Sequence, residues 1–437
     1  MNPPATAYRP ARAWSITFLV FIFMMVNYID KVALGLVAVP IMNEFHLSPT
    51  EFGVLASSFY WLFPVACVAG GFLANRYRAK TLLLIMALLW SAAQLPIALA
   101  ASATAIVVAR VLLGIGEGPS GPTATHAIFK WFPNERRNLP QTTMLMGATF
   151  GIMVASMVIP PISAQWGWRA CFVIMSGVGL AWAVLWALFG AEGTLDVASD
   201  AGRSAAAKIP YRTLLCNATI LGTMGLHFVA DWMVVLATTW LPAYLQQALG
   251  FDAVTAGRLF ALVVVVSIPI NFLMSYISQR LLTSGVSSRG ARGMVACACT
   301  TIAGLLLCVL MLVPFSPMQK VYLLAAALGL AITVFTLAIG IVGEVVPAGQ
   351  RGAMLAISNA IATVGTLPAP IITGWLIQTS TGQPMVHGYE MGFLLTGALM
   401  LIGAGIGYRY IDPERARKAL KAFAERPAPD LTLQRAA

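Results

Sequence analysis

Charged residues are scarce in this sequence of 437 residues: 10% are Asp, Glu, Lys or Arg, whereas 59% are hydrophobic. A soluble domain usually carries about 25% charged residues. The 27 basic and 16 acidic side chains are too few to cover the surface of a soluble protein of this length. Disorder is excluded as well, because disordered chains are rich in charge and poor in apolar residues. With a mean hydropathy of +0.81, the chain is predicted to be an all-α polytopic membrane protein.

Cysteine and chemical motifs are also scarce. The six cysteines lie in or next to apolar segments without the paired spacing of a disulfide framework. Cys297 and Cys299 share one apolar helix, which indicates packing rather than a metal site. The sequence has no phosphate-binding loop, nucleophile motif or metal-ligand cluster. We therefore expect no enzyme activity, no metal and no cofactor, and a membrane enzyme or non-transporting sensor is the least favoured class.

Long apolar runs fill most of the chain. A bilayer core is about 30 Å thick, so a helix needs ~20 apolar residues to cross it. Twelve segments have this length: 14–39, 51–74, 81–101, 104–129, 141–164, 170–189, 214–238, 254–279, 293–314, 321–345, 353–377 and 389–411. The first runs on without a small-residue cleavage site, so an uncleaved helix is expected rather than a signal peptide.

An internal repeat divides these spans into two groups of six. A shift of 204 residues pairs Gly53 with Gly257, and a shift of 214 pairs Gly151 with Gly365. The same shifts align the loops at 71–76 and 275–280, and those at 133–137 and 347–351. We expect two pseudo-symmetric six-helix bundles with a substrate site between them and alternating access. The expected units are the tail 1–13, the bundle 14–189, the linker 190–213, the bundle 214–411 and the tail 412–437.

The basic residues predict the orientation of the chain. With a cytoplasmic N-terminus, 22 of the 27 lie in cytoplasmic loops and tails, as the positive-inside rule requires. Both termini are therefore expected in the cytoplasm, with the protein in a bacterial inner membrane. The net charge of +11 is a topology signal, so no nucleic-acid partner is expected. The basic stretch 412–425 is predicted to be a solvated helical tail.

Among the ionisable residues inside predicted spans, five stand out: Asp30, Lys31, Arg110, Glu117 and Asp231. Such residues are costly in a bilayer and mark functional sites. Seven residues turn a helix by about 700°, so Arg110 and Glu117 share one face, with Asp30 at a depth between them. A cation beside two carboxylates suits an anionic substrate linked to protons, because desolvation favours the neutral form of a carboxylic acid.

Structural roles compete with these assignments. The alternative for the cluster is a set of buried salt bridges that only holds helices together. Lys31 could snorkel to the interface, and Asp231 could pair with His227 one turn earlier or line the cavity. Glu344 is predicted to lie at the cytoplasmic interface.

Several motifs resemble those of the major facilitator superfamily across all twelve spans. Two are general: Gly71-x-Leu73-Ala74-Asn75-Arg76-x-Arg78-x-Lys80 between spans 2 and 3, and Arg110-x-x-x-Gly114-x-Gly116 in span 4. Four are similar to its anion:cation symporter family: Asn27-Tyr28-Ile29-Asp30, the segment 110–119, Trp131-Phe132-Pro133-x-Glu135-Arg136 and Trp240-Leu241-Pro242-x-Tyr244-Leu245.

The resemblance implies proton-coupled uptake of a small organic anion, such as a sugar acid or an aromatic carboxylate. The runner-up is a proton-driven exporter of drugs or metabolites on the same fold. Asp30 and Glu117 would exchange protons, and the expected partners are the anion, protons and the bilayer, with a functional monomer. The substrate-binding candidates are Arg110, Lys31, Tyr28, Asn359 and Asp231. The conformational loop candidates are Gly71, Arg76, Lys80 and Arg280.

The sequence departs from the family pattern at three positions. Lys31 stands where the family usually has Arg, and it lacks the planar fork that grips a carboxylate. Asn75 replaces an Asp, which weakens a charge-based latch between the halves. Arg78 replaces a Gly, which puts the tight turn there in question. We expect transport to survive all three changes.

Overall fold

The computed structural model describes residues 10–133, 136–193, 209–347, 350–380 and 383–424. Most of the predicted linker and parts of both predicted tails lie outside these residues, as does Glu135 of the span 4–5 motif. Within them, twelve helical segments are long and apolar enough to cross a membrane. The predicted number and order of spans are thus confirmed.

The first six spans include two that are interrupted. The second span is broken near its middle, and the fourth is broken at Gly118-Pro119. The helices are α1 (Pro10–Leu36); α3 (Pro49–Ser57), η1 (Ser58–Tyr60) and α4 (Phe63–Arg76); α5 (Ala79–Ala98); α6 (Ala103–Glu117) and α7 (Ser120–Phe129); α8 (Asn138–Trp166); and α9 (Trp168–Phe189).

The last six spans follow the same plan. They are α12 (Ala218–Ala243) with η3 (Tyr244–Ala248); α13 (Ala253–Thr283); η4 (Arg289–Met294) with α14 (Val295–Leu312); α15 (Pro317–Val345); α16 (Arg351–Thr363), η6 (Val364–Thr366) and α17 (Pro368–Thr379); and α18 (Met385–Tyr410). In the described part of the chain, three shorter helices lie outside the spans: α2 (Ala38–Phe45), α11 (Tyr211–Leu215) and α19 (Pro413–Ala424).

The seventh span differs most from its predicted boundaries of 214–238. It begins at Ala218, because the Asn217 side chain accepts hydrogen bonds from the backbone N–H groups of Thr219 and Ile220 and so caps the helix. It continues through Pro242 into the π-helical turn η3 and ends at Ala248. A proline inside a membrane helix is tolerated because neighbouring groups satisfy the freed backbone carbonyl.

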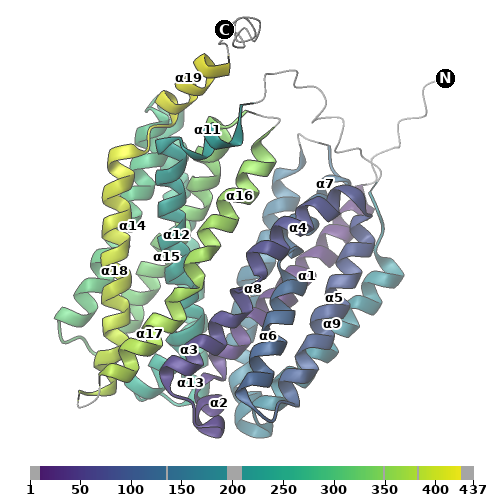
Figure 1. The fold of residues 1–437 in the computed structure, drawn as a ribbon, viewed down its shortest axis with the longest axis vertical. Coiled ribbons are helices and arrows are strands. Elements are labelled where there is room, and N and C mark those ends of the chain that lie inside the picture. Colours follow the sequence, from purple (N-terminus) through teal and green to yellow (C-terminus); the bar gives the residue numbers. More distant parts are fainter. Residues whose placement is uncertain (1–9, 134–135, 194–208, 348–349, 381–382, 425–437) are drawn as a thin grey trace, which may run out of the picture.

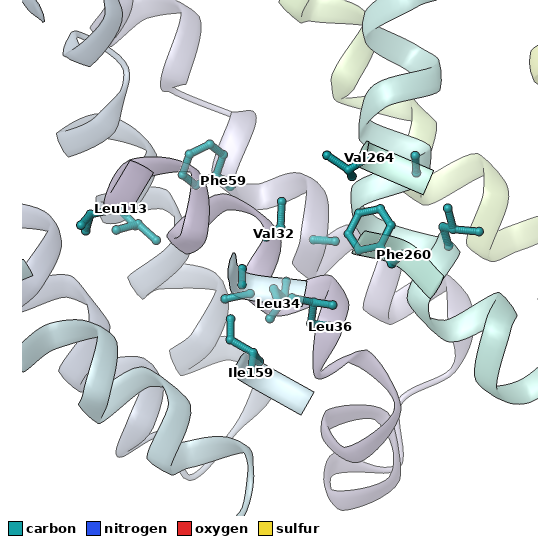
Figure 2. Packing of buried hydrophobic residues seen from close by; sticks show 14 of the residues in the cluster. Val32, Leu34, Leu36, Phe59, Leu113, Ile159, Phe260 and Val264 are labelled. Atoms are coloured by element: carbon teal, nitrogen blue, oxygen red, sulfur yellow. The ribbon is translucent and has the colours of Figure 1, made fainter. Parts of the chain in front are cut away.

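The spans form two bundles, one from each half of the chain (Figure 1). Their ribbons lie close together at the end that carries α2 and α3 and spread apart toward the end that carries α7, α11 and α19. At the closed end, α3 packs on α17 and α8 packs on α13. Figure 2 shows part of the buried apolar cluster, which we call the apolar seal and which includes Val32 and Leu36 of α1 and Phe260 and Val264 of α13.

The paired glycines of the repeat make equivalent contacts. A Cβ on Gly53 of α3 would lie 2.4 Å from the carbonyl oxygen of Pro370 in α17, and one on Gly257 of α13 would lie 2.3 Å from that of Ser156 in α8. The first contact joins spans 2 and 11, and the second joins spans 8 and 5. The repeat relates these two pairs of spans, so both halves use a glycine at the same place.

A second pair of glycines follows the same rule within each half. A Cβ on Gly151 of α8 would lie 2.3 Å from the carbonyl oxygen of Met25 in α1, whereas one on Gly365 of η6 would meet the Phe228 ring of α12 at 2.8 Å. Span 5 thus approaches span 1 as span 11 approaches span 7. The two bundles are related units, as the repeat predicts.

A glutamate after the last span of each bundle holds the start of its third span. Glu192 accepts hydrogen bonds from the backbone N–H groups of Ala79 and Lys80 at the start of α5, and its Oε1 lies 2.6 Å from Lys130 Nζ. In the other half, Glu414 accepts from the backbone N–H of Ser288, just before η4. Each carboxylate lies at a helix N-terminus, where the backbone dipoles favour negative charge.

The C-terminal helix α19 is docked rather than solvated. Ala416 and Leu420 are buried against the C-terminal bundle, beside Leu214, Ile220 and Val346. The prediction of a solvated tail is wrong for this segment, because one face of the helix is apolar and the bundle end offers apolar surface to it. Residues 425–437 lie outside the described part.

Candidate functional site

The interior of the N-terminal bundle holds a cation and two carboxylates. Asp30 of α1 and Arg110 and Glu117 of α6 are all buried, with at most 3% of each residue exposed. Glu117 and Arg110 are among the charges that act on Asp30, so the three form one electrostatic cluster. The structure therefore brings together three residues that the sequence analysis selects.

The cluster is not a set of salt bridges. Among the described residues, no ion pair of 4.0 Å or less joins Arg110 to Asp30 or Glu117. Asp30 Oδ1, Arg110 Nε and Nη1, and both carboxylate oxygens of Glu117 have no hydrogen-bond partner within the described part. Buried polar groups without partners are costly. Chemically, groups without partners can take up a proton or a ligand.

Neutral polar side chains surround this cluster, and the sequence analysis does not select them. Gln94 of α5 lies beside Asp30, and Asn27 of α1 lies beside Glu117. Asn27 Oδ1 accepts a hydrogen bond of 3.5 Å from Ser120 Oγ. Gln94 is completely buried, and its amide has no partner among the residues described. A single glutamine in an apolar membrane helix is itself a signal that could have identified it.

Aromatic rings face the cations of the site. Lys31 Nζ lies 4.3 Å from the centre of the Tyr28 ring and 5.2 Å from that of Phe63. Arg110 Cζ lies 4.7 Å from the centre of the Phe59 ring. Lys31 is half-buried in α1. The cation–π contacts with Tyr28 and Phe63 hold its ammonium group among aromatic side chains.

Tyr60 connects the two halves of the site. Its side chain lies within electrostatic range of Arg110, Glu117 and Tyr28 in the N-terminal bundle and of Asp231 in the C-terminal bundle. It follows Phe59 in η1, where the second span is broken. Nothing in its local sequence distinguishes it from a packing tyrosine, so the sequence analysis does not select it.

For Asp231 the sequence leaves two roles open, a pairing with His227 and a place in the lining of the cavity. Its Oδ2 lies 3.9 Å from His227 Nε2, too far for a hydrogen bond, and its side chain remains 17% exposed. His227 packs edge-on against the Phe335 ring, with centroids 4.8 Å apart. Glu344 lies instead near the end of α15, paired with Arg292 at 2.7 Å and accepting from Ser288 Oγ.

Asn359 stays apart from the charged cluster. It is exposed on α16, and its side chain makes no hydrogen bond with the described residues. The structure therefore does not bring Asn359 into contact with Asp30, Arg110 or Glu117.

The predicted loop residues lie at bundle ends. Gly71 and Arg76 belong to the last part of α4, and a Cβ on Gly71 would meet nothing within 4 Å. Lys80 Nζ donates to the carbonyl oxygen of Ala187, and Arg280 Nε donates to the Tyr276 hydroxyl. Each of these two hydrogen bonds lies within one bundle, and the structure does not bring the four loop residues together.

Arg78 and Asn75 are the two departures from the family pattern in the loop between spans 2 and 3. Arg78 has φ −65° and ψ 131°, an extended conformation open to any residue, so the turn forms without glycine. The Asn75 side chain lies outside the described side chains.

A cavity of about 400 Å³ lies between the bundles, lined by α8, α12, α13 and α15. The charged residues selected from the sequence do not line it. Its wall from α12 contains Val234, Ala237 and Thr238, and its wall from α13 contains Phe260 and Val264 of the apolar seal. A volume of this size is that of a small-molecule site.

Comparison with known proteins gives one family for the whole chain. The family model described as the Major Facilitator Superfamily matches residues 16–310 and 282–436. Similar curated proteins include a probable sulfoacetate transporter of Cupriavidus necator, 28% identical, with 89% of this chain and 91% of that protein covered. A hexuronate transporter of Bacillus subtilis is 25% identical, with 90% and 94% covered. A probable galactarate/D-glucarate transporter of the same species is also 25% identical, with 90% and 89% covered.

Solved structures share the fold at low sequence identity. A bacterial homologue of the human lysosomal transporter Spinster, in an inward-facing and unoccupied conformation, superposes with a TM-score of 0.76 at 18% identity, covering 94% of this chain and 98% of its own. A D-xylose–proton symporter superposes with a TM-score of 0.71 at 16% identity, with 92% and 99% covered. The arrangement of two six-helix bundles is thus shared by transporters of different substrates.

Proposed function

The chain belongs to the major facilitator superfamily, and from this premise we propose that it takes up a small organic anion together with protons. It is a multi-pass membrane transporter and not an enzyme. Three of its curated relatives are named for sulfoacetate, hexuronate and galactarate or D-glucarate, which are organic anions. These names support an anionic substrate for this chain.

One observation supports the proton coupling above all others. Asp30 and Glu117 are buried next to Arg110, yet neither carboxylate is paired with it among the described residues. A buried charge without a partner is costly, and a carboxylic acid relieves that cost by taking a proton. Two such groups in the path between the bundles are suited to load protons on one side of the membrane and release them on the other.

Arg110 links protonation to the anion. When Asp30 and Glu117 are protonated, the guanidinium is the main charge left in the cluster, and a substrate carboxylate can pair with it bidentately. When the two acids lose their protons, they compete with the substrate for the same cation. Proton release on the far side therefore promotes release of the anion.

The remaining candidate residues have supporting roles around Arg110 and the substrate anion. Lys31, held by Tyr28, adds a second positive charge facing the anion. Asp231 and Asn359 belong to the C-terminal bundle and would reach the substrate as the halves approach. The loop residues Gly71, Arg76, Lys80 and Arg280 would control contacts between the bundle ends during the transition.

In this proposal the two bundles move as units relative to each other. The moving units are 14–189 and 214–411, joined by the linker 190–213, and the functional unit is a monomer. Both termini face the cytoplasm of a bacterial inner membrane, in agreement with the distribution of basic residues.

The proton sites can be tested by separating accumulation from exchange. In proteoliposomes with an alkaline interior, Asp30→Asn and Glu117→Gln should abolish gradient-driven carboxylate accumulation, because an amide cannot carry a proton. Exchange of labelled for unlabelled substrate should remain. Glu44→Gln is the matched control, since Glu44 of the short helix α2 is paired with Arg169 at the start of α9, away from the charged cluster. Full accumulation by both variants would overturn the proton-site assignment.

A further inference from the structure

The cavity between the bundles is uncharged and mainly apolar. No Asp, Glu, Lys, Arg or His lines it. Its walls are formed by aromatic and aliphatic side chains such as Met146, Phe150, Val264, Ile268 and Ile332. Burial of apolar surface is the main source of affinity that such walls provide.

Three of the six hydroxyl groups in the lining donate hydrogen bonds within their own helices. Thr238 Oγ1 donates to the Val234 carbonyl oxygen, and Ser267 Oγ donates to that of Val264. Ser275 Oγ donates to Asn271 Oδ1. A ligand covered with hydroxyl groups needs a donor or acceptor for each of them, because a buried polar group without a partner is costly. The hydroxyl protons of Thr238, Ser267 and Ser275 are therefore already used in these hydrogen bonds.

The cavity borders the charged side of the site. A Cβ on Gly35 of α1 would lie 2.0 Å from the carbonyl oxygen of Thr238, a cavity residue, and Gly35 follows Lys31 by about one helical turn. On α12, Asp231 precedes Val234 by three residues and Thr238 by seven, so all three share one helix face. Tyr60 lies within electrostatic range of both Asp231 and Arg110, so it connects this face of α12 to the charged cluster. A ligand in the cavity thus has an apolar environment around its body and cations on the side of the N-terminal bundle.

We propose that this cavity holds the apolar body of the substrate, which makes the transported anion a carboxylate with an aryl or alkyl group rather than a polyhydroxy acid. The inference rests on the proposed function and narrows its substrate class. The volume of about 400 Å³ accommodates a substituted benzene ring, and the carboxylate faces the cations of α1 and α6.

Direct binding to the purified protein tests the class of substrate. We expect phenylacetate to bind at least ten times more tightly than D-glucuronate, by isothermal titration at neutral pH. Equal affinity, tighter binding of D-glucuronate or no binding of either compound would overturn the inference. The failure of the proposed function looks different: proton-driven accumulation of D-glucuronate without phenylacetate binding removes only the inference, whereas no proton-driven uptake of either compound removes both.

A pair of variants on α15 tests the location. Ile332 lines the cavity, whereas Ile339 is 53% exposed on the same helix and does not. Ile332→Trp should weaken phenylacetate binding at least tenfold, and Ile339→Trp should leave it unchanged, with equal melting temperatures showing that both variants fold. Ile332→Ala enlarges the cavity and should favour 2-naphthylacetate relative to phenylacetate. If Ile332→Trp binds phenylacetate normally, the cavity is not the substrate site and the inference is overturned.

Discussion

Arg110 is a buried guanidinium that lacks hydrogen bonds from two of its nitrogen atoms to the described residues. If it pairs with the substrate carboxylate, Arg110→Ala removes a charge-assisted hydrogen bond worth about 1.5–3 kcal/mol, or roughly a 10- to 100-fold loss of affinity. Arg110→Lys should recover part of that loss, because it keeps the charge but not the planar fork. The affinity of purified protein for phenylacetate measures both effects.

Arg169→Ala serves as the control for this substitution. Arg169, at the start of α9, pairs with Glu44 at 2.6 Å, so its removal should leave the affinity unchanged. Unchanged affinity of Arg110→Ala would instead exclude Arg110 from the binding site.

Charged site residues could be selected from the sequence more readily than neutral ones. Asp30 and Glu117 stand out because an ionisable residue in a bilayer is costly and therefore rare. Gln94 and Tyr60 are less costly and occur in membrane helices for packing alone. The contact of Lys31 with Phe63 also escapes sequence reasoning, because it depends on how the second span bends at η1 and not on local spacing.

Glu192, which follows the end of α9, joins the start of α5 to Lys130 at the end of α7. Partial burial acts to raise the pKa of Glu192, but the Lys130 ammonium and the amides of Lys80 and Ala79 outweigh it, so the pKa is lowered. A carboxyl group whose pKa is lowered by folding stabilises the protein at pH values above its pKa in the unfolded state, about 4.3. This stabilisation is lost as the pH falls through the pKa of the group in the folded state.

The prediction for Glu192→Gln is a pH-dependent loss of stability. At neutral pH the variant should lose about 1 kcal/mol, the usual contribution of a helix cap, and the difference from the wild-type protein should shrink below about pH 4. Melting temperatures in detergent across this pH range test it. A constant difference at every pH would show that the charge of Glu192 has no part in this stability.

Apolar length predicted the spans, but their ends and breaks depend on finer features. The cap at Asn217 and the continuation of α12 into η3 moved the seventh span toward the C-terminus by four residues at its start and ten at its end. The break at Gly118-Pro119 separates α6 from α7 within a continuous apolar run. Hydropathy cannot detect either feature, because capping and proline change hydrogen bonding without changing apolar character.

The arrangement of the two bundles follows from close approaches between distant segments. The sequence repeat predicted that Gly53 and Gly257 are equivalent, and the structure shows each at a contact between bundles. Which helices meet there could not be derived from the sequence, because α3 and α17 are separated by most of the chain and their contact depends on tertiary packing.

Substitution of Gly257 tests the importance of this close approach. A Cβ there would lie 2.3 Å from the Ser156 carbonyl oxygen and 2.6 Å from Pro160 Cγ, so Gly257→Ala should force α13 from α8 at a cost of about 1–3 kcal/mol. Gly177→Ala is the control, because a Cβ on Gly177 meets nothing within 4 Å. Thermal unfolding of both variants measures this difference. Equal stability of Gly257→Ala and Gly177→Ala would mean that the bundles do not need this contact.

Proton movement with the anion is the central claim for the whole molecule, and it can be measured directly. Wild-type protein is reconstituted into liposomes in a weakly buffered medium containing a pH indicator, and phenylacetate or D-glucuronate is added outside. We predict that the external pH rises as the carboxylate enters, and that Glu117→Gln abolishes this rise. Carboxylate entry with no change in external pH would contradict proton symport.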